Sequence, residues 1–93
     1  MKKLPKQFEI LGRKYDIQYE KSLGDSLGIC FPDHGLIKIM KNKLLPRDSV
    51  EHTLWHEVSH AILYAMGEEE LFKNEKFIDL LGGILYQISK TLK

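Results

Sequence analysis

The chain has 93 residues, of which 43% are hydrophobic and 29% are charged, and these proportions exclude a disordered polypeptide and favour one globular domain over residues 1–93. Fourteen basic and thirteen acidic side chains give a net charge of +1, so no overall field favours nucleic acid or an anionic membrane as a partner. The basic cluster of Lys2, Lys3 and Lys6 is expected to be a solvated end and is assigned no function.

Cys30 is the only cysteine, so an internal disulfide and a cysteine-rich zinc knuckle are both excluded. The sequence turns polar directly after its first lysines, which does not resemble an export signal. The longest apolar run, residues 61–66, is far shorter than the ~20 residues that cross a bilayer. The expected location of the protein is therefore the cytoplasm.

The first half of the chain has the alternating pattern of β-strands. Apolar residues alternate at positions 8 and 10 before Gly12-Arg13 and at positions 15, 17 and 19 after it, which predicts a hairpin with a short turn there. Residues 27–31 and 36–40 flank the turn sequence Pro32-Asp33-His34-Gly35, which predicts a second hairpin. We expect a small, mainly antiparallel sheet of three or four strands.

A first helix is expected after Pro46, where the hydrophobic period changes. Asp48 followed three residues later by Glu51 predicts a capping box at its start. The helix should run to about Met66, with Gly67 ending it. The predicted fold class is α+β, with the sheet packed against this helix.

A second, C-terminal helix is indicated by apolar residues at helical spacing over residues 77–92, and its start is open between Glu68 and Asn74. Gly82 and Gly83 each cost this helix roughly 1 kcal/mol relative to alanine. Such a cost indicates a packing reason, and a close approach to the first helix would provide one.

The first helix contains His56-Glu57-Val58-Ser59-His60, an HExxH pattern. At about 100° per residue, His56, Glu57 and His60 project from one face of the helix. Apolar residues such as Leu54, Val58 and Ala61 fall on the opposite face, so the helix can bury one side and present the other. Two imidazoles one turn apart can bind one metal ion.

A third metal ligand is needed, because catalytic zinc sites usually have three protein ligands and leave the fourth position to water. The carboxylates that follow His60 are Glu68, Glu69, Glu70, Glu75 and Asp79. Glu75 is favoured because it begins an otherwise apolar helix, whereas the glutamate triplet lies just past a helix end. One turn beyond Glu75, Asp79 is placed to accept a hydrogen bond from the far ring nitrogen of a ligand histidine.

The pair HEVSH and Asn74-Glu75-Lys76-Phe77-Ile78-Asp79 resembles the gluzincin signature, in which HExxH is followed on a second helix by NExxxD. In size the chain is similar to the minimal stand-alone gluzincins, or minigluzincins, and to small metallopeptidase-like proteins of phages and bacterial mobile elements. The resemblance implies a minimal zincin-like domain with one Zn²⁺ per chain, held by His56, His60 and Glu75. It also implies that Glu57 is the general base and Asp79 the hydrogen-bond partner of His56.

The expected function is that of a zinc-dependent endopeptidase, in which Glu57 takes a proton from a zinc-bound water and a peptide or protein substrate aligns along an exposed edge strand. Thermolysin-like enzymes draw a transition-state-stabilising His or Tyr from a C-terminal subdomain that has no counterpart in residues 1–93. Tyr64 and Tyr86 are the candidates to replace it, followed by His34 and His52. The alternative function is that of a zinc-binding but latent or catalytically silent module with a binding or regulatory role.

Overall fold

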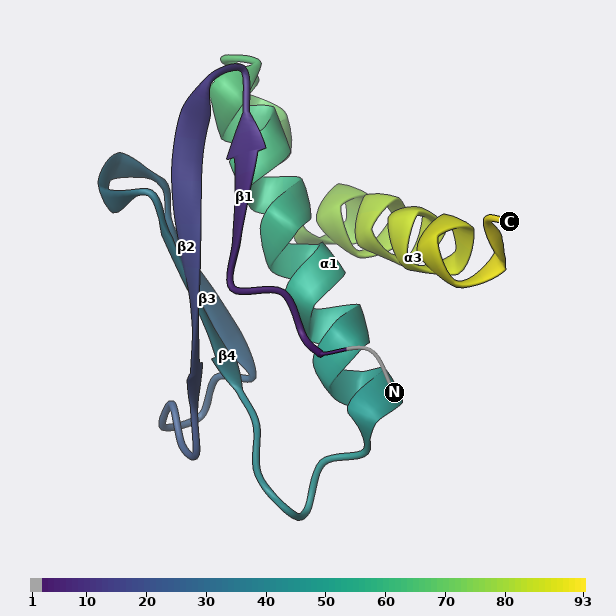
Figure 1. Cartoon of the computed structure of the whole chain (residues 1–93). Helices are drawn as coiled ribbons and strands as arrows, with labels where there is room; N and C mark the ends of the chain where they lie inside the picture. The colour runs from purple at the N-terminus through teal and green to yellow at the C-terminus, as the bar shows by residue number, and fades with distance from the viewer. Residues whose placement is uncertain (1–2) are drawn as a thin grey trace.

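The computed structural model describes residues 3–93 and shows one sheet with a helix against one face and a further long helix beyond it (Figure 1). The strands are β1 (Gln7–Ile10), β2 (Arg13–Glu20), β3 (Gly28–Phe31) and β4 (Leu36–Met40), with a 3-10 turn η1 (Pro32–His34) between the last two. The helices are α1 (Arg47–Ala65), α2 (Glu69–Phe72) and α3 (Glu75–Thr91). The predicted α+β class is confirmed. Lys2 of the basic cluster lies outside the described residues.

Both predicted hairpins are present. The β1–β2 pair is antiparallel, with Ile10 opposite Arg13 and a two-residue turn at Leu11 and Gly12. These two residues have φ angles of 50° and 83°, the positive values that a tight hairpin turn of matching twist requires. The β3–β4 pair is also antiparallel, with Phe31 opposite Leu36 across η1.

The prediction of a mainly antiparallel sheet was wrong, because the four strands form a mixed sheet in the order β1-β2-β4-β3. β2 and β4 are parallel, in register from Asp16 opposite Leu36 to Glu20 opposite Met40. Residues 21–27 lead from β2 to β3, which is not its neighbour in the sheet. The following strand, β4, then lies between β2 and β3. Alternation in a sequence determines which face of a strand is buried but not which strand lies beside it. The result places β3 at the edge of the sheet.

The core lies between the sheet and α1. Ile37 and Ile39 of the central strand β4 have no exposed surface, and they pack with Tyr15 and Ile17 of β2. From α1, the apolar residues at helical spacing complete this core: Val50, Leu54, Val58 and Ala61. The opposite face of α1 is thereby left for α3 and for the polar residues of the HExxH pattern.

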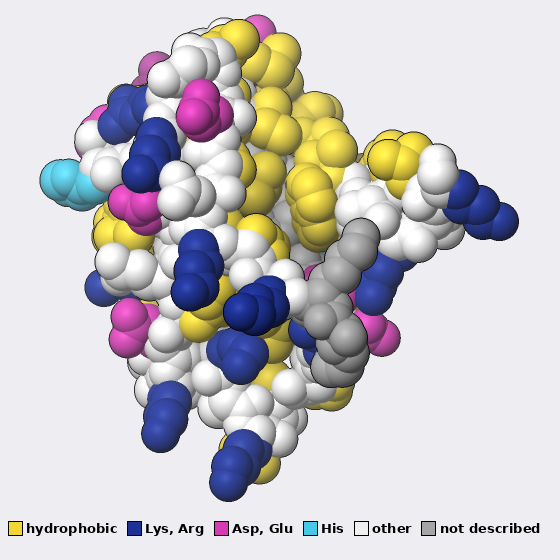
Figure 2. Space-filling view, viewed as in Figure 1, with side chains coloured by type: hydrophobic (Ala, Val, Ile, Leu, Met, Phe, Trp, Pro, Cys, Tyr) yellow, Lys and Arg dark blue, Asp and Glu magenta, His cyan; other side chains and the backbone are white. Residues whose placement is uncertain are grey.

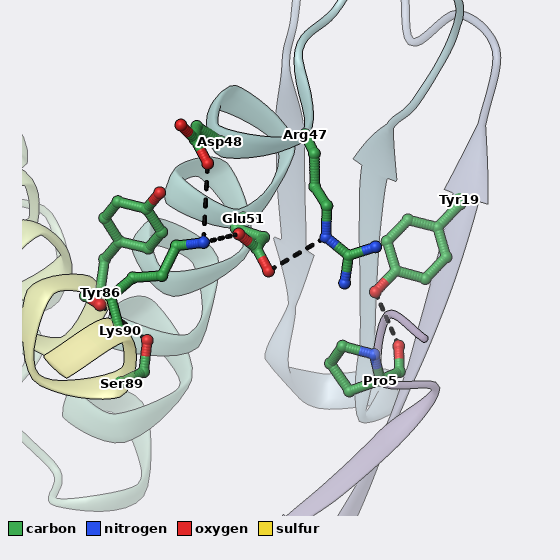
Figure 3. Close-up of polar contacts among 8 residues, drawn as sticks. All are labelled: Pro5, Tyr19, Arg47, Asp48, Glu51, Tyr86, Ser89 and Lys90. Carbon is green, nitrogen blue, oxygen red and sulfur yellow. Dashed lines mark hydrogen bonds and ion pairs between the residues drawn. The ribbon is translucent and has the colours of Figure 1, made fainter. Parts of the chain in front are cut away.

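The predicted capping box at Asp48 was also wrong. α1 begins at Arg47 after Pro46, and no side chain caps its first turn. Glu51 instead lies 3.4 Å from Arg47 and 3.0 Å from Lys90 of α3, and Asp48 lies 3.6 Å from the same Lys90 amine (Figure 3). Both carboxylates thus form ion pairs with Lys90, which is far along the chain. These ion pairs join the C-terminal part of α3 to the first turn of α1.

The start of the C-terminal helix, which the sequence left open, is at Glu75. Asn74 caps α3, and its side-chain oxygen accepts a hydrogen bond from the Phe77 backbone N–H at 3.1 Å. The short helix α2 precedes this cap and contains two of the three glutamates of the acidic triplet. Across residues 3–93, no helix combines the length and apolar character of a membrane span.

Candidate metal centre

α1 supplies two histidines and a glutamate to one side of the molecule. His56 and His60 are one turn apart, their rings meet edge-on with centroids 5.3 Å apart, and their side chains are 19% and 12% exposed. Glu57 lies beside them and is almost fully buried. The helix therefore holds two partly buried imidazoles on a rigid element, each still open on one side.

α3 brings Glu75 to these histidines. One Glu75 carboxylate oxygen lies 3.1 Å from His56 Nε2, and the other lies 3.2 Å from His60 Nε2. Because Glu75 is the first residue after the Asn74 cap, its position follows directly from where α3 begins. Of the five carboxylates considered from the sequence, Glu75 is the one that meets both rings.

The three side chains form a donor set that fits a metal ion. A nitrogen from each histidine and an oxygen of Glu75 all lie within 4.8 Å of one another, and among the described residues this group could hold a metal. Burial lowers the pKa of His60 despite the opposing effect of Glu75, which favours the neutral imidazole that metals bind. Two imidazoles and one carboxylate also leave a coordination position open, as catalytic sites do.

Asp79 orients His56 from the other side of the ring. Its carboxylate lies 2.8 Å from His56 Nδ1, and it stands one turn after Glu75 on α3. A proton held on Nδ1 by this contact would leave Nε2, the nitrogen that faces Glu75, free to bind a metal ion. The contact that the sequence predicted between Asp79 and a histidine ring is therefore present, and it leaves Nε2 of His56 facing the donor set.

Replacing Asp79 by Ala is expected to weaken zinc affinity by roughly 10- to 100-fold while the fold persists, because the ring loses the group that sets its orientation and tautomer. The measurement is a competition titration against a chromophoric chelator, accompanied by a circular dichroism melt. Unchanged affinity would contradict this role, as would an Asp79 oxygen bonded to the metal in a crystal structure.

Gly82 is where α3 crosses α1, directly over His56. A Cβ at position 82 would lie 2.9 Å from His56 Cα and 3.1 Å from its backbone nitrogen. Both atoms belong to the main chain of a helix and cannot move aside cheaply. At Gly83 the nearest atom would be His52 Nε2 at 3.8 Å, an ordinary contact. The packing reason expected for the glycine pair thus applies to Gly82, which sets the distance between the helix carrying Glu75 and the helix carrying the histidines.

Gly82→Ala is expected to reduce zinc affinity by about tenfold or more and to destabilise the fold by about 1–3 kcal/mol, because the added methyl group forces α3 away from His56. Gly83→Ala is the matched control. It should stabilise α3 by up to about 1 kcal/mol through helix propensity and leave zinc affinity unchanged. If zinc titrations and melts showed the two variants behaving alike, close approach at Gly82 would not be what positions Glu75.

Glu57 occupies the space between α1 and the edge strand. Only 6% of its surface is exposed, and a Cβ at Gly28 of β3 would come within 3.1 Å of its carboxylate oxygen. Burial raises the pKa of Glu57 to about 7, with a smaller increase from Glu75 and an opposing effect of His56. A carboxyl group that gives and takes a proton near neutral pH suits a general base. Sequence reasoning missed Gly28, although a glycine in a strand is itself a sign of close approach.

Comparison with family models, curated proteins and solved structures finds no match for this chain.

An open cleft of about 570 Å³ lies in front of the donor set. Residues 26–30 border it on the sheet side, α1 contributes His52, Thr53, His56, Glu57 and His60, and Phe72, Glu75 and Asp79 close it. The cleft thus combines an edge strand, the buried general-base candidate and the donor set in one space.

The candidates for transition-state stabilisation lie in different places. Tyr64 donates a hydrogen bond to Asp33 of η1, and Tyr86 packs edge-on against His52 at 5.6 Å. Neither tyrosine lines the cleft, and His34 stands in η1 away from it. Of these four side chains the structure brings only His52 to the cleft.

Cys30 also lines the cleft, from β3. Burial raises the pKa of its thiol from 9.0 to about 12, with a further contribution from Glu57. Because the thiolate is the reactive form, alkylation by iodoacetamide at pH 8 is expected to be at least about 100-fold slower in the folded protein than in urea. Equal rates in the two states, measured by mass spectrometry over time, would show that this wall of the cleft is open.

Proposed function

We propose that this protein is a zinc-dependent metallopeptidase of the minimal gluzincin type, which hydrolyses peptide bonds with Glu57 as general base. The observation that carries the proposal is the position of Glu57. This buried carboxyl group, with a pKa near 7, lies beside a donor set of two histidines and one glutamate at the wall of an open cleft.

Each residue has a definite role in the proposed reaction. His56, His60 and Glu75 would hold the zinc ion, which when bound supplies a Lewis acid that polarises the scissile carbonyl and lowers the pKa of water. Glu57 takes a proton from the attacking water onto its carboxylate and delivers it to the leaving amine nitrogen. Asp79 keeps the proton on Nδ1 of His56, so that the opposite nitrogen remains a lone-pair donor.

The edge strand suggests how a substrate is held. β3 pairs with β4 on one side only, so its other side is a free edge among the described strands. Residues 26–30 border the cleft along this edge, and Gly28 packs there against Glu57 of α1. An extended peptide added along this edge would make main-chain hydrogen bonds that carry its backbone past the donor set. The substrate class we propose is therefore an extended peptide or an unfolded protein segment.

A catalytically silent, zinc-binding module is the second candidate. It is favoured by the positions of Tyr64 and Tyr86, which lie outside the cleft and leave His52 as the nearest candidate to stabilise developing negative charge. Both candidates bind zinc, and only the first turns over a substrate. We expect weak cleavage, because neither tyrosine lines the cleft and His52 is the side chain left to take that role.

The test begins with protein purified without a chelator or histidine tag. Elemental mass spectrometry should find one zinc per chain, and a broad peptide library should show cleavage that stops when the zinc is removed and returns when zinc is restored. Cleavage that survives removal of the zinc would contradict the proposal. A fully loaded protein that cleaves nothing in the library would establish the silent module instead.

A further inference from the structure

α3 is strongly amphipathic, yet it turns its apolar side away from α1. With Phe77 at zero on a helical wheel of about 100° per residue, seven apolar residues fall within an arc of about 140°. These are Phe77, Leu80, Leu81, Ile84, Leu85 and Ile88 of α3 and Leu92, the residue that follows its last turn. The residues in contact with α1 and the metal site, Ile78, Gly82, Glu75 and Asp79, lie at about 100° to 200° on the same wheel. We call the set of seven the α3 apolar face.

Much of the α3 apolar face is open to solvent. The exposed fraction runs from 37% at Phe77 through 60% at Leu80, 55% at Ile84 and 49% at Ile88 to 77% at Leu92. In Figure 1 α3 lies beyond α1 and points away from the sheet, and Figure 2 shows hydrophobic side chains along the upper edge of α3 and in the angle between α3 and α1. A helix this apolar is normally stable only when that side is covered.

The exposed area is what a small dimer interface requires. The five most exposed side chains of the α3 apolar face present roughly 500 Å² in total, and two copies would bury roughly 1,000 Å², the lower bound for a specific interface. The largest apolar patch on a monomer is often a functional contact surface at this size.

The spacing of the face matches a copy of itself running in the opposite direction. Phe77 and Leu92, Leu81 and Ile88, and Ile84 and Leu85 are each equally distant from the midpoint between residues 84 and 85. A two-fold axis through that midpoint sets two α3 helices antiparallel, and every one of these six residues then faces an apolar partner. Such self-complementarity is what a two-fold dimer interface requires of its surface.

The charges of α3 favour a protein partner over a lipid surface. Its polar side carries Glu75 and Asp79 at the metal site, and Lys90 is paired with Glu51 and Asp48 of α1. A helix that lies on an anionic membrane needs a row of free basic residues along the apolar border. Lys90 and the two acidic residues are therefore engaged with α1, and Lys76 alone beside Leu80 does not make such a row.

We propose that two copies of this chain associate through the α3 apolar face, with their α3 helices antiparallel about a two-fold axis between residues 84 and 85. The centre of the face lies about 150° to 170° around the helix from Glu75 and Asp79, so the dimer leaves both clefts open. This association depends on neither zinc nor peptidase activity.

The first experiment measures mass in solution by light scattering and sedimentation. The wild-type chain is expected at twice its 10.8 kDa mass at micromolar concentration, and Ile84→Glu or Ile88→Glu is expected to halve the mass without loss of helical circular dichroism. The control is Leu44→Glu, which changes an apolar residue that is 89% exposed outside α3 and should leave the dimer intact.

The second experiment tests the direction of the helices in a Cys30→Ser background. Protein carrying Phe77→Cys is mixed with protein carrying Leu92→Cys, and a short bismaleimide should join the two variants to each other in preference to joining either with itself. Strong cross-linking of Phe77→Cys to itself would overturn the antiparallel arrangement. A wild-type chain that stays monomeric up to about 1 mM would overturn the dimer, as would association that survives both glutamate variants. Binding to phosphatidylglycerol vesicles that competes with dimer formation would assign the face to a membrane instead.

Discussion

Replacing Glu57 by Gln is expected to lower peptide hydrolysis by about 10²- to 10⁴-fold, the range that a positioned general base contributes. The amide keeps nearly the same shape but cannot take a proton from water. Zinc content and melting temperature should stay close to those of the wild type, because Glu57 is separate from the three donor side chains. Both quantities and the rate are measured on the two proteins at equal concentration.

Glu57→Ala is a useful companion variant, because the cavity it leaves beside Gly28 tests packing separately from proton transfer. If Gln preserved the melting temperature and Ala lowered it, with both variants inactive, Glu57 would contribute to stability through its volume and to catalysis through its charge. Cleavage that persists in Glu57→Gln would point to another base or to a contaminating protease, and the mechanism would be withdrawn.

Removing any one of the three donor side chains is expected to abolish stoichiometric zinc. In His56→Ala, His60→Ala or Glu75→Ala, two protein ligands remain, and a site of two ligands does not hold zinc through purification in competition with water. Elemental mass spectrometry should then give well below one zinc per chain, and hydrolysis should fall with it. The melting temperature of the zinc-loaded wild type should also exceed that of each variant, because a ligand that binds only the folded state stabilises it.

The control for this series is Glu69→Ala in α2, because that carboxylate belongs to the acidic triplet and is engaged with Lys73. It should bind zinc as the wild type does. Full zinc in Glu75→Ala together with loss in Glu69→Ala would show that the third donor comes from the triplet, and α3 would then have to move relative to α1 on binding.

Local sequence determined the parts of this protein that depend on spacing within one element. The 3.6-residue period of α1 places His56, Glu57 and His60 on one face and Leu54, Val58 and Ala61 on another, whatever the helix packs against. The two hairpins, the choice of Glu75 over the acidic triplet and the position of Asp79 one turn later follow from similarly local rules.

Tertiary structure decided everything that depends on residues far apart in the chain. The mixed order of the sheet, which puts β3 at the edge of the cleft, arises because β4 inserts beside β2, and no alternation pattern specifies that neighbour. Asp48 and Glu51 form ion pairs with Lys90 and do not cap α1. Lys90 reaches them only because α3 packs against α1, which no local pattern specifies.

The two features that make the centre chemically specific are also tertiary. The pKa of Glu57 rises to about 7 chiefly because β3 and α1 together exclude water from it. The Glu75 carboxylate reaches both imidazoles only because Gly82 lets two helices cross with backbone against backbone. The sequence by itself specified which side chains are available and on which face they stand, whereas desolvation and helix approach are properties of packed neighbours and exist only once the chain has folded.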